Sequence, residues 1–527
     1  MTLATAFQPW RVRVFIASLT GWRSTLLVFL VGALSALAMA PFHAWLAMAA
    51  GLSVLIWSLD GVHKRPRKLK SAFWRGFVFG MGYFLAGTFW VGFAFINRGP
   101  EFIPLIPIAL PAFAAILAVF WGGAMALYVA IGQRSVWRIL GFAASIAIFE
   151  WLRGHVFSGL PWNLPAYTWE AGGAVSQAAA WFGVYGLSLL TVLMLVSPAM
   201  AVSRAYPIKN LLPALAGLVI FLVLFSMGSL RLATADVSPL LETRFRIVQL
   251  AVTQAEKWGP DGDISTRGRY LEMTASPGLD QVTHVLWPEG ALPTFMLEDV
   301  ETLRLIGEVL PEETLLLSGV NRREASETGL RYYNSLAVMD FSSIAPHYSL
   351  YDKVRLVPFG ETVPFVELLA AIGFEEFARL QFSPGPGPAV LEVEGAATMM
   401  PLICYEAIFP NFVNASTQRP DWLFNLSNDA WFGDNSGPRQ HLNQARFRSI
   451  ETGLPLIRSA SRGISGVIDP LGRMPVRIEI EDEGAHDVSL PRPVAATAYA
   501  KWGDTLFWIV ALGLLVGIVF ARRERRS

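Results

Sequence analysis

The stretch MMPLICYEAIFP, residues 399–410, is an apolar run that ends at Cys404 and is followed by an acid, Glu406. The run has the length of a strand, and Cys404 is the single cysteine among 527 residues. A polar residue directly after a buried strand lies where a rigid sheet can present it to a crevice. The stretch therefore predicts a layered α/β unit with Cys404 at a strand end. A lone cysteine in this position is also a common small core residue, so the surrounding sequence has to decide its role.

Apolar runs of strand length recur between residues 231 and 503, and helical patterns separate many of them. Eight runs predict strands, at 244–252, 284–289, 314–320, 334–340, 398–406, 422–428, 454–460 and 466–470. Three patterns predict helices, at 298–310, 363–380 and 439–453. Strands that alternate with helices favour an α/β layered domain.

Two further stretches place a polar residue at the end of an apolar strand, as the Cys404 stretch does. VLWPEGALP (285–293) contains Glu289, and YDKVRLVPFGE (351–361) contains Lys353 and Glu361. Taken singly, Glu289 could cap a turn and Lys353 could be a solvated loop lysine. Three such strand ends in one domain instead predict a shared site. We expect the side chain of Lys353 to point into the crevice of this site and to add little to packing.

The remainder of the chain has the composition of a membrane protein. Hydrophobic residues make up 53% of the sequence and charged residues 16%, against about 25% charged residues in soluble domains. A helix needs about 20 apolar residues to cross a bilayer. Eight stretches near this length predict membrane spans, at 24–40, 43–59, 72–96, 103–132, 137–153, 173–200, 211–230 and 505–521.

Basic residues orient these predicted spans, because short loops rich in Lys and Arg stay in the cytoplasm. Such loops lie at 63–70, 132–138, 203–209 and 521–527, all on one side of an eight-span arrangement. We therefore expect a membrane bundle at 1–235, an extracytoplasmic α/β domain at 240–500, and a last span with a basic tail at 503–527. In a bacterium with two membranes this is an inner-membrane protein with a periplasmic domain.

Charge and cysteine content exclude several classes of function. The formal net charge of +1 gives no indication of nucleic-acid binding. One cysteine allows no intramolecular disulfide and no cysteine-rich metal cluster. His441 has no second His or Cys at ligand spacing, so we predict no metal site and interpret His441 as a residue at a helix start.

The ordered Glu, Lys and Cys stretches resemble the nitrilase superfamily. Together with SNDAWFG (427–433), LVPFGE (356–361) and the predicted membrane helices, the whole chain resembles the apolipoprotein N-acyltransferase family. The resemblance implies an αββα sandwich inserted between membrane helices, acting without a cofactor, and we expect a monomer. It also implies transfer of an acyl chain from a phospholipid, preferably phosphatidylethanolamine, to the N-terminal diacylglyceryl-cysteine of an apolipoprotein.

The three residues suit acyl transfer chemically. A thiol needs a base before it can attack an ester, and Glu289 is the carboxylate that could deprotonate Cys404. The resulting oxyanion could be stabilised by Lys353 and by the backbone N–H of Tyr405. A thioester on Cys404 would then react readily with an amine.

The resemblance adds supporting and substrate-binding residues. Glu361 and Glu406 are predicted to support the site, with a purely structural pairing to Lys353 as the alternative. The predicted substrate contacts are Trp258, Asn334, Trp431 and Trp162. For the tryptophans, packing or a membrane-interface position is the competing interpretation, and for Asn334 it is a hydrogen bond at a strand edge.

Two stretches depart from the family pattern, and both lie outside the Glu289, Lys353 and Cys404 stretches. The segment 248–258 lacks the usual glycine-containing turn, and Ser461 and Arg462 stand where paired asparagines are common. Three other functions remain as alternatives: a membrane-tethered amide or nitrile hydrolase, a transporter with an accessory domain, and a non-catalytic binding module. A seven-helix bundle ahead of the domain argues against a merely tethered hydrolase. The scarcity of ionisable residues in the spans argues against a transporter, and the intact Glu, Lys and Cys positions argue against a binding module.

Overall fold

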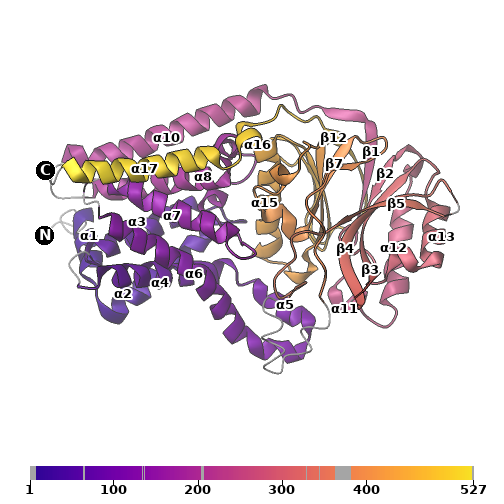
Figure 1. The fold of residues 1–527 in the computed structure, drawn as a ribbon, viewed down its shortest axis with the longest axis horizontal. Helices are drawn as coiled ribbons and strands as arrows, with labels where there is room; N and C mark the ends of the chain where they lie inside the picture. Colours follow the sequence, from indigo (N-terminus) through magenta and orange to yellow (C-terminus); the bar gives the residue numbers. More distant parts are fainter. Residues whose placement is uncertain are drawn as a thin grey trace. The chain divides into compact units, whose positions relative to one another are not determined.

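The computed structural model describes residues 8–62, 66–132, 135, 137–202, 207–327, 329–343, 345–362 and 381–524. The chain forms two compact units (Figure 1). The helical unit comprises Met1–Thr234 and Thr497–Ser527, and the layered unit comprises Ala235–Ala496. The helix predicted at 363–380 lies outside the described residues, as do parts of all four basic loops.

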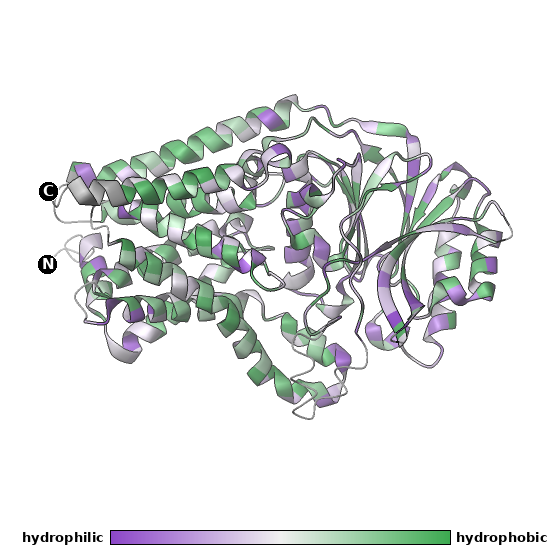
Figure 2. Cartoon of the chain, in the orientation of Figure 1, coloured by the Kyte–Doolittle hydropathy of each residue, from purple (hydrophilic) through white to green (hydrophobic). Residues whose placement is uncertain are grey.

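The helical unit consists mainly of apolar helices, which Figure 2 shows by their predominantly hydrophobic colouring. Their bounds are α1 Pro9–Ser18, α2 Gly21–Ser35, α3 Trp45–Asp60, α4 Lys68–Gly87, α5 Val91–Arg98, α6 Ile106–Ile131, α7 Arg138–His155, α8 Ala179–Val196, α9 Pro198–Ala201, α10 Pro207–Thr234, α16 Ala498–Trp502 and α17 Thr505–Glu524.

Four helical stretches among the described residues are long and apolar enough to cross a membrane. They are Gly21–Ala38, Pro100–Ile131, Val175–Ala201 and Ile208–Thr234. The bent pair α4 and α5, which meet at 50°, makes a fifth if it counts as one span. Trp45–Asp60 and Thr505–Ile518 are apolar but shorter, and α7 carries three charged residues, Arg138, Glu150 and Arg153. The unit is thus compatible with a membrane, and the count of eight spans stays a prediction.

Helix α10 shows what a membrane would contact. Large apolar side chains project from it into the surroundings instead of into the protein: Leu211, Leu212, Leu215, Leu218, Val219, Leu222, Val223 and Phe225 are all exposed. In water this surface would be unfavourable, because each buried apolar Å² is worth about 25 cal/mol. In a bilayer the same side chains contact lipid.

Helices α2 and α4 approach so closely that only glycine fits at two contact positions. A Cβ on Gly32 would lie 2.2 Å from the carbonyl oxygen of Phe79, and one on Gly82 would lie 2.1 Å from that of Phe29. Small residues at helix contacts are typical of membrane bundles, in which close van der Waals packing replaces the hydrophobic effect.

The layered unit contains two six-stranded sheets. The first has the order β12-β1-β2-β3-β4-β5, formed by β12 Gly484–Pro491, β1 Pro239–Gln249, β2 His284–Leu286, β3 Leu315–Ser326, β4 Gly329–Asp340 and β5 His347–Asp352. The second has the order β11-β10-β9-β8-β7-β6, formed by β11 Val476–Ile478, β10 Ser465–Ile468, β9 Leu456–Ser461, β8 Trp422–Asn428, β7 Thr398–Ile403 and β6 Leu391–Glu392. Strands β1, β2 and β3 run parallel, and so do β7, β8 and β9.

Successive side chains of a strand point to opposite faces of its sheet, so the first sheet contributes to two separate cores. Leu317 of β3 belongs to the core between the sheets, with residues such as Met399 and Phe424 of the second sheet. Its neighbour Leu316 packs in a second core against Ile306, which lies in helix α13 (Val300–Val309). This alternation follows from the two-residue period of a strand.

Helices cover both outer faces and complete four layers, as Figure 1 shows. Helices α12 (Gly262–Thr274) and α13 lie against the first sheet, and α15 (Ser436–Thr452) lies on the side of the second. The layered α/β class is therefore confirmed as an αββα sandwich.

The eight predicted strands correspond to the eight inner strands, and the four that sequence analysis missed are the sheet edges β5, β6, β11 and β12. An edge strand has fewer buried positions and so lacks an apolar run; β5 buries only Tyr351. Two of the three predicted helices match α13 and α15.

Candidate active site

The three predicted polar residues lie within three residues of the ends of strands in the two sheets. Glu289 lies three residues beyond β2, Lys353 is the residue after β5, and Cys404 is the residue after β7. Cys404 begins the short 3-10 helix η10, Cys404–Ile408. Because both sheets face the core between them, these strand ends converge.

Glu289 is held by three donors. Its Oε1 accepts hydrogen bonds from Nδ2 of Asn334 at 2.7 Å and from Nζ of Lys353 at 3.1 Å. Its Oε2 accepts one at 2.8 Å from the backbone N–H of Asn428, the last residue of β8. Only 8% of Glu289 is exposed, so the carboxylate has a fixed orientation.

Lys353 lies between two carboxylates. Its Nζ is 3.1 Å from Oε1 of Glu289 and 2.8 Å from Oε1 of Glu361, and the side chain is 1% exposed. Glu361 also accepts hydrogen bonds from Asn334 Nδ2 and from the backbone N–H of Val357, both at 2.8 Å. Because Lys353 is buried and forms ion pairs with both Glu289 and Glu361, it holds these two carboxylates in place. The expectation that Lys353 adds little to packing is therefore wrong.

These contacts fix the charges. Burial alone would raise the pKa of Glu289, but the Lys353 ammonium and the hydrogen bonds from Asn334 and Lys353 outweigh it, so the pKa is lowered. Burial alone would lower the pKa of Lys353, but the carboxylates of Glu289 and Glu361 raise it above its usual range. At neutral pH the site therefore holds an ionised carboxylate and an ammonium.

Cys404 stays a thiol until a base acts on it. Burial and the nearby Glu289 carboxylate raise its pKa, although Lys353 opposes them. The influence also runs the other way, because the nearby Cys404 thiol contributes to the lowered pKa of the Glu289 carboxyl. The backbone of Cys404 has φ +48°, a left-handed conformation that L-residues avoid and that recurs at functional sites.

Glu406 joins the Cys404 strand end to the segment that carries Lys353. It is fully buried, and its carboxylate accepts hydrogen bonds from the backbone N–H groups of Ile403, Val354 and Arg355 at 2.8, 2.7 and 3.2 Å. Burial raises the pKa of Glu406 to about 7, against the effect of these donors. The geometry gives Glu406 a positioning contact to both segments. Tyr405, its neighbour, packs edge-on against Phe409, with ring centroids 5.0 Å apart.

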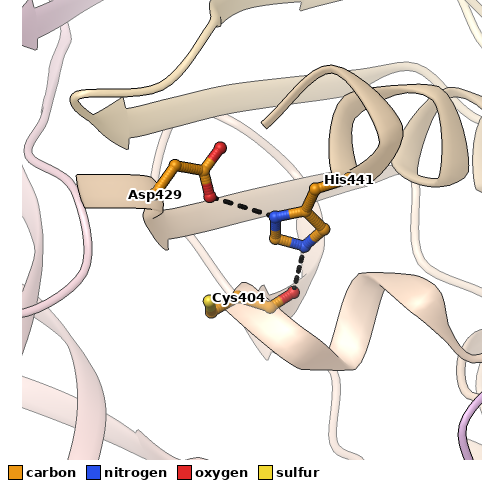
Figure 3. Close-up of side chains that lie close together, drawn as sticks. All are labelled: Cys404, Asp429 and His441. Carbon is orange, nitrogen blue, oxygen red and sulfur yellow. Dashed lines mark hydrogen bonds and ion pairs between the residues drawn. The ribbon is translucent and has the colours of Figure 1, made fainter. Parts of the chain in front are cut away.

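A second cluster holds the other side of Cys404 (Figure 3). Nε2 of His441 lies 3.0 Å from the backbone carbonyl oxygen of Cys404, and Nδ1 lies 3.0 Å from Oδ1 of Asp429. Oδ2 of Asp429 accepts a 2.6 Å hydrogen bond from Arg458. Sequence analysis missed this cluster, because residues 404, 429, 441 and 458 show no common spacing. His441 lies near the start of α15, as predicted, and its side chain is buried.

Cys404, Asp429 and His441 also have the residue types of a metal site, and their potential ligand atoms lie within 4.8 Å of one another. Both ring nitrogens of His441 already face oxygen partners, and Asp429 already pairs with the Arg458 guanidinium. These donors are oriented toward one another, and a guanidinium at the carboxylate disfavours a second cation there. The arrangement is that of a hydrogen-bonded cluster.

The four predicted substrate contacts lie in different surroundings. Trp258 is 60% exposed and donates from Nε1 to Gln254, whose own amide donates to Asn428 beside Glu289. Trp431 is 36% exposed, at the end of the short helix η12, Asp429–Trp431. Both side chains thus present aromatic surface next to residues of the site.

Asn334 and Trp162 are buried. Asn334 donates to both Glu289 and Glu361, while its Oδ1 has no hydrogen-bond partner among the described residues. Trp162 belongs to the helical unit, is 2% exposed and packs on Trp90, with ring centroids 4.7 Å apart. Its backbone carbonyl accepts a 2.9 Å hydrogen bond from Arg153, so the loop after α7 is tied to that helix.

Lys257 is a buried residue that the sequence did not single out. It ends helix α11, Gln254–Lys257, and its Nζ donates to the backbone carbonyl of Gly290, the residue after Glu289. Burial lowers the pKa of Lys257 to about 8, although Glu289 opposes this. The two stretches that depart from the family pattern also meet, because Arg462 donates to the backbone carbonyl of Ala251 at 3.2 Å.

Two family models match the chain: the apolipoprotein N-acyltransferase N-terminal domain at residues 31–197 and carbon-nitrogen hydrolase at residues 249–497. A solved amidase from Nesterenkonia sp. AN1, in complex with acrylamide, matches 49% of this chain and 94% of that chain at 18% identity and a TM-score of 0.35. A TM-score this low does not establish a shared fold.

Curated relatives match over nearly the full length. Proteins named apolipoprotein N-acyltransferase are 37% identical in Rhodopseudomonas palustris, with 96% of each chain covered, and 37% identical in Bradyrhizobium diazoefficiens, with 98% of each covered. One in Caulobacter vibrioides is 39% identical, with 95% of each covered. With this identity over the whole chain and both domain matches, the chain belongs to the apolipoprotein N-acyltransferase family.

Proposed function

We propose that Cys404 carries an acyl chain between a phospholipid and the α-amino group of the N-terminal diacylglyceryl-cysteine of an apolipoprotein. Family membership makes the protein an acyltransferase that N-acylates lipoproteins. The observation that supports this route most directly is the buried constellation of Glu289, Lys353 and the Cys404 thiol. Phosphatidylethanolamine is the donor that we expect.

In the first step, Cys404 attacks the ester carbonyl of the phospholipid while its proton passes to Glu289. The C–S bond forms, the ester C–O bond breaks, and the departing lysophospholipid oxygen takes the proton from Glu289. The products are a thioester on Cys404 and a lysophospholipid. The ionised Glu289 carboxylate can take the proton while the C–S bond forms, so no free thiolate has to form first in the buried site.

In the second step, the amine of the apolipoprotein attacks the thioester carbonyl. One amine proton passes to Glu289, the C–S bond breaks, and the Cys404 sulfur takes that proton back. The net reaction exchanges an ester for an amide and restores the thiol. Asn334 Oδ1, which has no hydrogen-bond partner in the described parts of the chain, is a candidate acceptor for an N–H of the incoming amine.

Both steps develop a negative oxygen that needs donors. An ammonium carries three hydrogens, and Lys353 directs two of them to Glu289 and Glu361. The third is the one that we assign to the oxyanion, together with the backbone N–H of Tyr405. Glu361 and Glu406 act as positioning residues through Lys353 and through the strand end of Cys404. Trp258, Trp431 and Trp162 remain proposed substrate contacts.

We further propose the cellular arrangement that the basic loops predict: an inner-membrane protein with eight spans, a membrane bundle at 1–235, a periplasmic catalytic domain at 240–500, and a last span and basic tail at 503–527. The four or five membrane-compatible helices support a membrane protein at a coarser level. We expect a monomer.

Mass spectrometry of the purified protein tests the thioester. After incubation with phosphatidylethanolamine and no amine acceptor, the Cys404 peptide should carry an acyl mass that neutral hydroxylamine removes. Addition of a diacylglyceryl-cysteine peptide should then move the acyl chain to the amine of that peptide.

The Cys404→Ser variant is the matched control. Its hydroxyl is much less acidic than a thiol, and any oxygen ester that forms should resist neutral hydroxylamine and yield no triacylated peptide. Continuous release of free fatty acid, or of ammonia from small amides, by the wild-type protein would instead indicate the hydrolase. Triacylation by the serine variant at the wild-type rate would refute the thioester route.

A further inference from the structure

The peptide group between Cys404 and Tyr405 is held from one side by His441. The carbonyl oxygen of Cys404 can only accept a hydrogen bond, so Nε2 of His441, at 3.0 Å, carries the hydrogen. A trans peptide is planar, and its C=O and N–H point in opposite directions. Fixing the Cys404 carbonyl therefore fixes the direction of the Tyr405 N–H, which points away from His441.

Figure 3 shows the sulfur of Cys404 on the side opposite the carbonyl oxygen that His441 contacts. The Tyr405 N–H points away from His441, whereas the sulfur lies within 4.8 Å of a potential ligand atom of that residue. We propose that His441 is a positioning residue: it orients the Tyr405 N–H as an oxyanion donor for both acyl-transfer steps. This inference rests on the proposed thioester route and assigns His441 a function that the route itself does not require.

The imidazole is itself immobilised. Nδ1 of His441 faces Oδ1 of Asp429 at 3.0 Å, and Asp429 also accepts 2.6 Å hydrogen bonds from Ser427 and from Arg458. His441, Asp429 and Arg458 are each 1% exposed or less. Because both ring nitrogens contact buried partners, the ring does not rotate freely, so the donor direction does not depend on substrate.

The backbone of Cys404 shows why a holding contact is needed. Its φ of +48° lies in a region that residues with a side chain avoid. Conformations of this kind persist only where the surroundings enforce them. Without the His441 contact, the peptide between Cys404 and Tyr405 is free to turn toward a relaxed conformation, and the N–H turns with it.

The test separates donor orientation from thiol reactivity. Acylation of Cys404 by phospholipid passes through an oxyanion, whereas alkylation of Cys404 by iodoacetamide does not. Because Cys404 is the only cysteine, alkylation of the whole protein reports this thiol alone. His441→Leu removes the donor at similar volume, and His441→Gln keeps an N–H donor.

We expect His441→Leu to slow thioester formation by about 100-fold in kcat, the loss typical of one oxyanion donor. KM for phosphatidylethanolamine and the alkylation rate should stay near wild type. His441→Gln should recover most of the rate. The matched control is His284→Leu: His284 is also 1% exposed, and its Nε2 also faces a backbone carbonyl, that of Glu394 at 2.8 Å. It should lower the thermal midpoint without slowing thioester formation.

Two outcomes would overturn the assignment of His441. The first is a leucine variant that forms the thioester at the wild-type rate. The second is a leucine variant that loses alkylation and acylation in equal proportion, which would mean that His441, Asp429 and Arg458 only support the fold of the segment around Cys404. If the leucine variant does not fold, a folded glutamine variant with slow thioester formation overturns it too, and one with fast formation supports it. Failure of the proposed function is distinct, because the wild-type protein would then form no thioester.

Discussion

At the scale of single residues, the buried charges of the site are tolerated only together. Glu289 and Glu361 are two carboxylates against the one ammonium of Lys353. The N–H donors of Asn334 and Val357 help to solvate the excess negative charge. Removing one partner of a buried ion pair leaves an uncompensated charge, which is far more costly than the intact pair. The same pairing keeps Glu289 ionised and thus ready to accept a proton.

Substitution of Lys353 should therefore affect both activity and stability. Lys353→Ala leaves two adjacent buried carboxylates and should cost about 3–5 kcal/mol of stability, with no detectable thioester. Lys353→Arg should also fail, because a planar guanidinium does not fit a site built for a compact ammonium. Thermal unfolding and acyl-adduct mass spectrometry measure the two effects. Near-normal turnover in the arginine variant would mean that the ammonium has no specific role.

Lys257 predicts a pH dependence of stability with a definite sign. The pKa of Lys257 is about 8 in the folded protein, below its ordinary value of 10.5. Below pH 8 both the folded and the unfolded state hold the proton, and the folded state bears the cost of a buried ammonium. Between pH 8 and 10.5 only the unfolded state keeps the proton, so stability relative to an uncharged residue rises with pH.

Lys257→Met should therefore have a higher thermal midpoint than wild type at pH 7, and this advantage should shrink between pH 8 and about 10.5. The lost hydrogen bond to Gly290 is the same at every pH and does not alter the trend. Thermal unfolding in detergent measures it, with Lys501→Met, at an exposed lysine, as the control. An advantage that stays constant across this range would contradict the assignment.

At the scale of the elements, strand β3 packs closely against the turn at residues 288–290, and this contact sets the position of Glu289. Gly319 of β3 accepts a hydrogen bond from Ala291 at 3.1 Å and donates one to the carbonyl of Pro288 at 3.2 Å. A Cβ at this glycine would lie 2.5 Å from Cα of Glu289 and 2.6 Å from the backbone nitrogen of Gly290. Both are backbone atoms and cannot rotate away, so the turn would have to move.

Gly319→Ala should therefore slow thioester formation by on the order of 100-fold, the loss expected when a catalytic group moves by about 1 Å. Gly268→Ala is the control, because nothing lies within 4 Å of a Cβ on Gly268 in α12. It should keep wild-type activity and add up to about 1 kcal/mol of stability. A fully active Gly319→Ala protein would show that the turn can yield without moving the Glu289 carboxylate.

At the scale of the whole molecule, the layered unit is an insertion between two apolar helices, α10 and α17. If the eight-span arrangement is correct, a reporter fused at Leu330 should be active only outside the cytoplasm. A reporter at the C-terminus should be active only inside. A reporter at Leu330 that is active inside the cytoplasm, or a C-terminal reporter that is active outside it, would overturn the arrangement. A reporter fused in the basic loop after α6 is a further control that should be active inside the cytoplasm.

The sequence by itself determined the eight inner strands and the apolar helices, because burial leaves a local pattern in composition that needs no partner to be recognised. It also singled out Glu289, Lys353 and Cys404 as polar residues at strand ends, and their catalytic roles remain a proposal. The tertiary structure alone decided the four edge strands, which β12 illustrates: its exposed and partly exposed positions carry little apolar signal until it pairs with β1. It also decided the contact of His441 with Cys404 and the burial of Lys257 beside Gly290. These contacts join residues that are 37 and 33 positions apart, and they depend on how α15 packs against η10 and how α11 lies against the Glu289 turn. No local pattern encodes such distances, because they arise only when separate elements have packed.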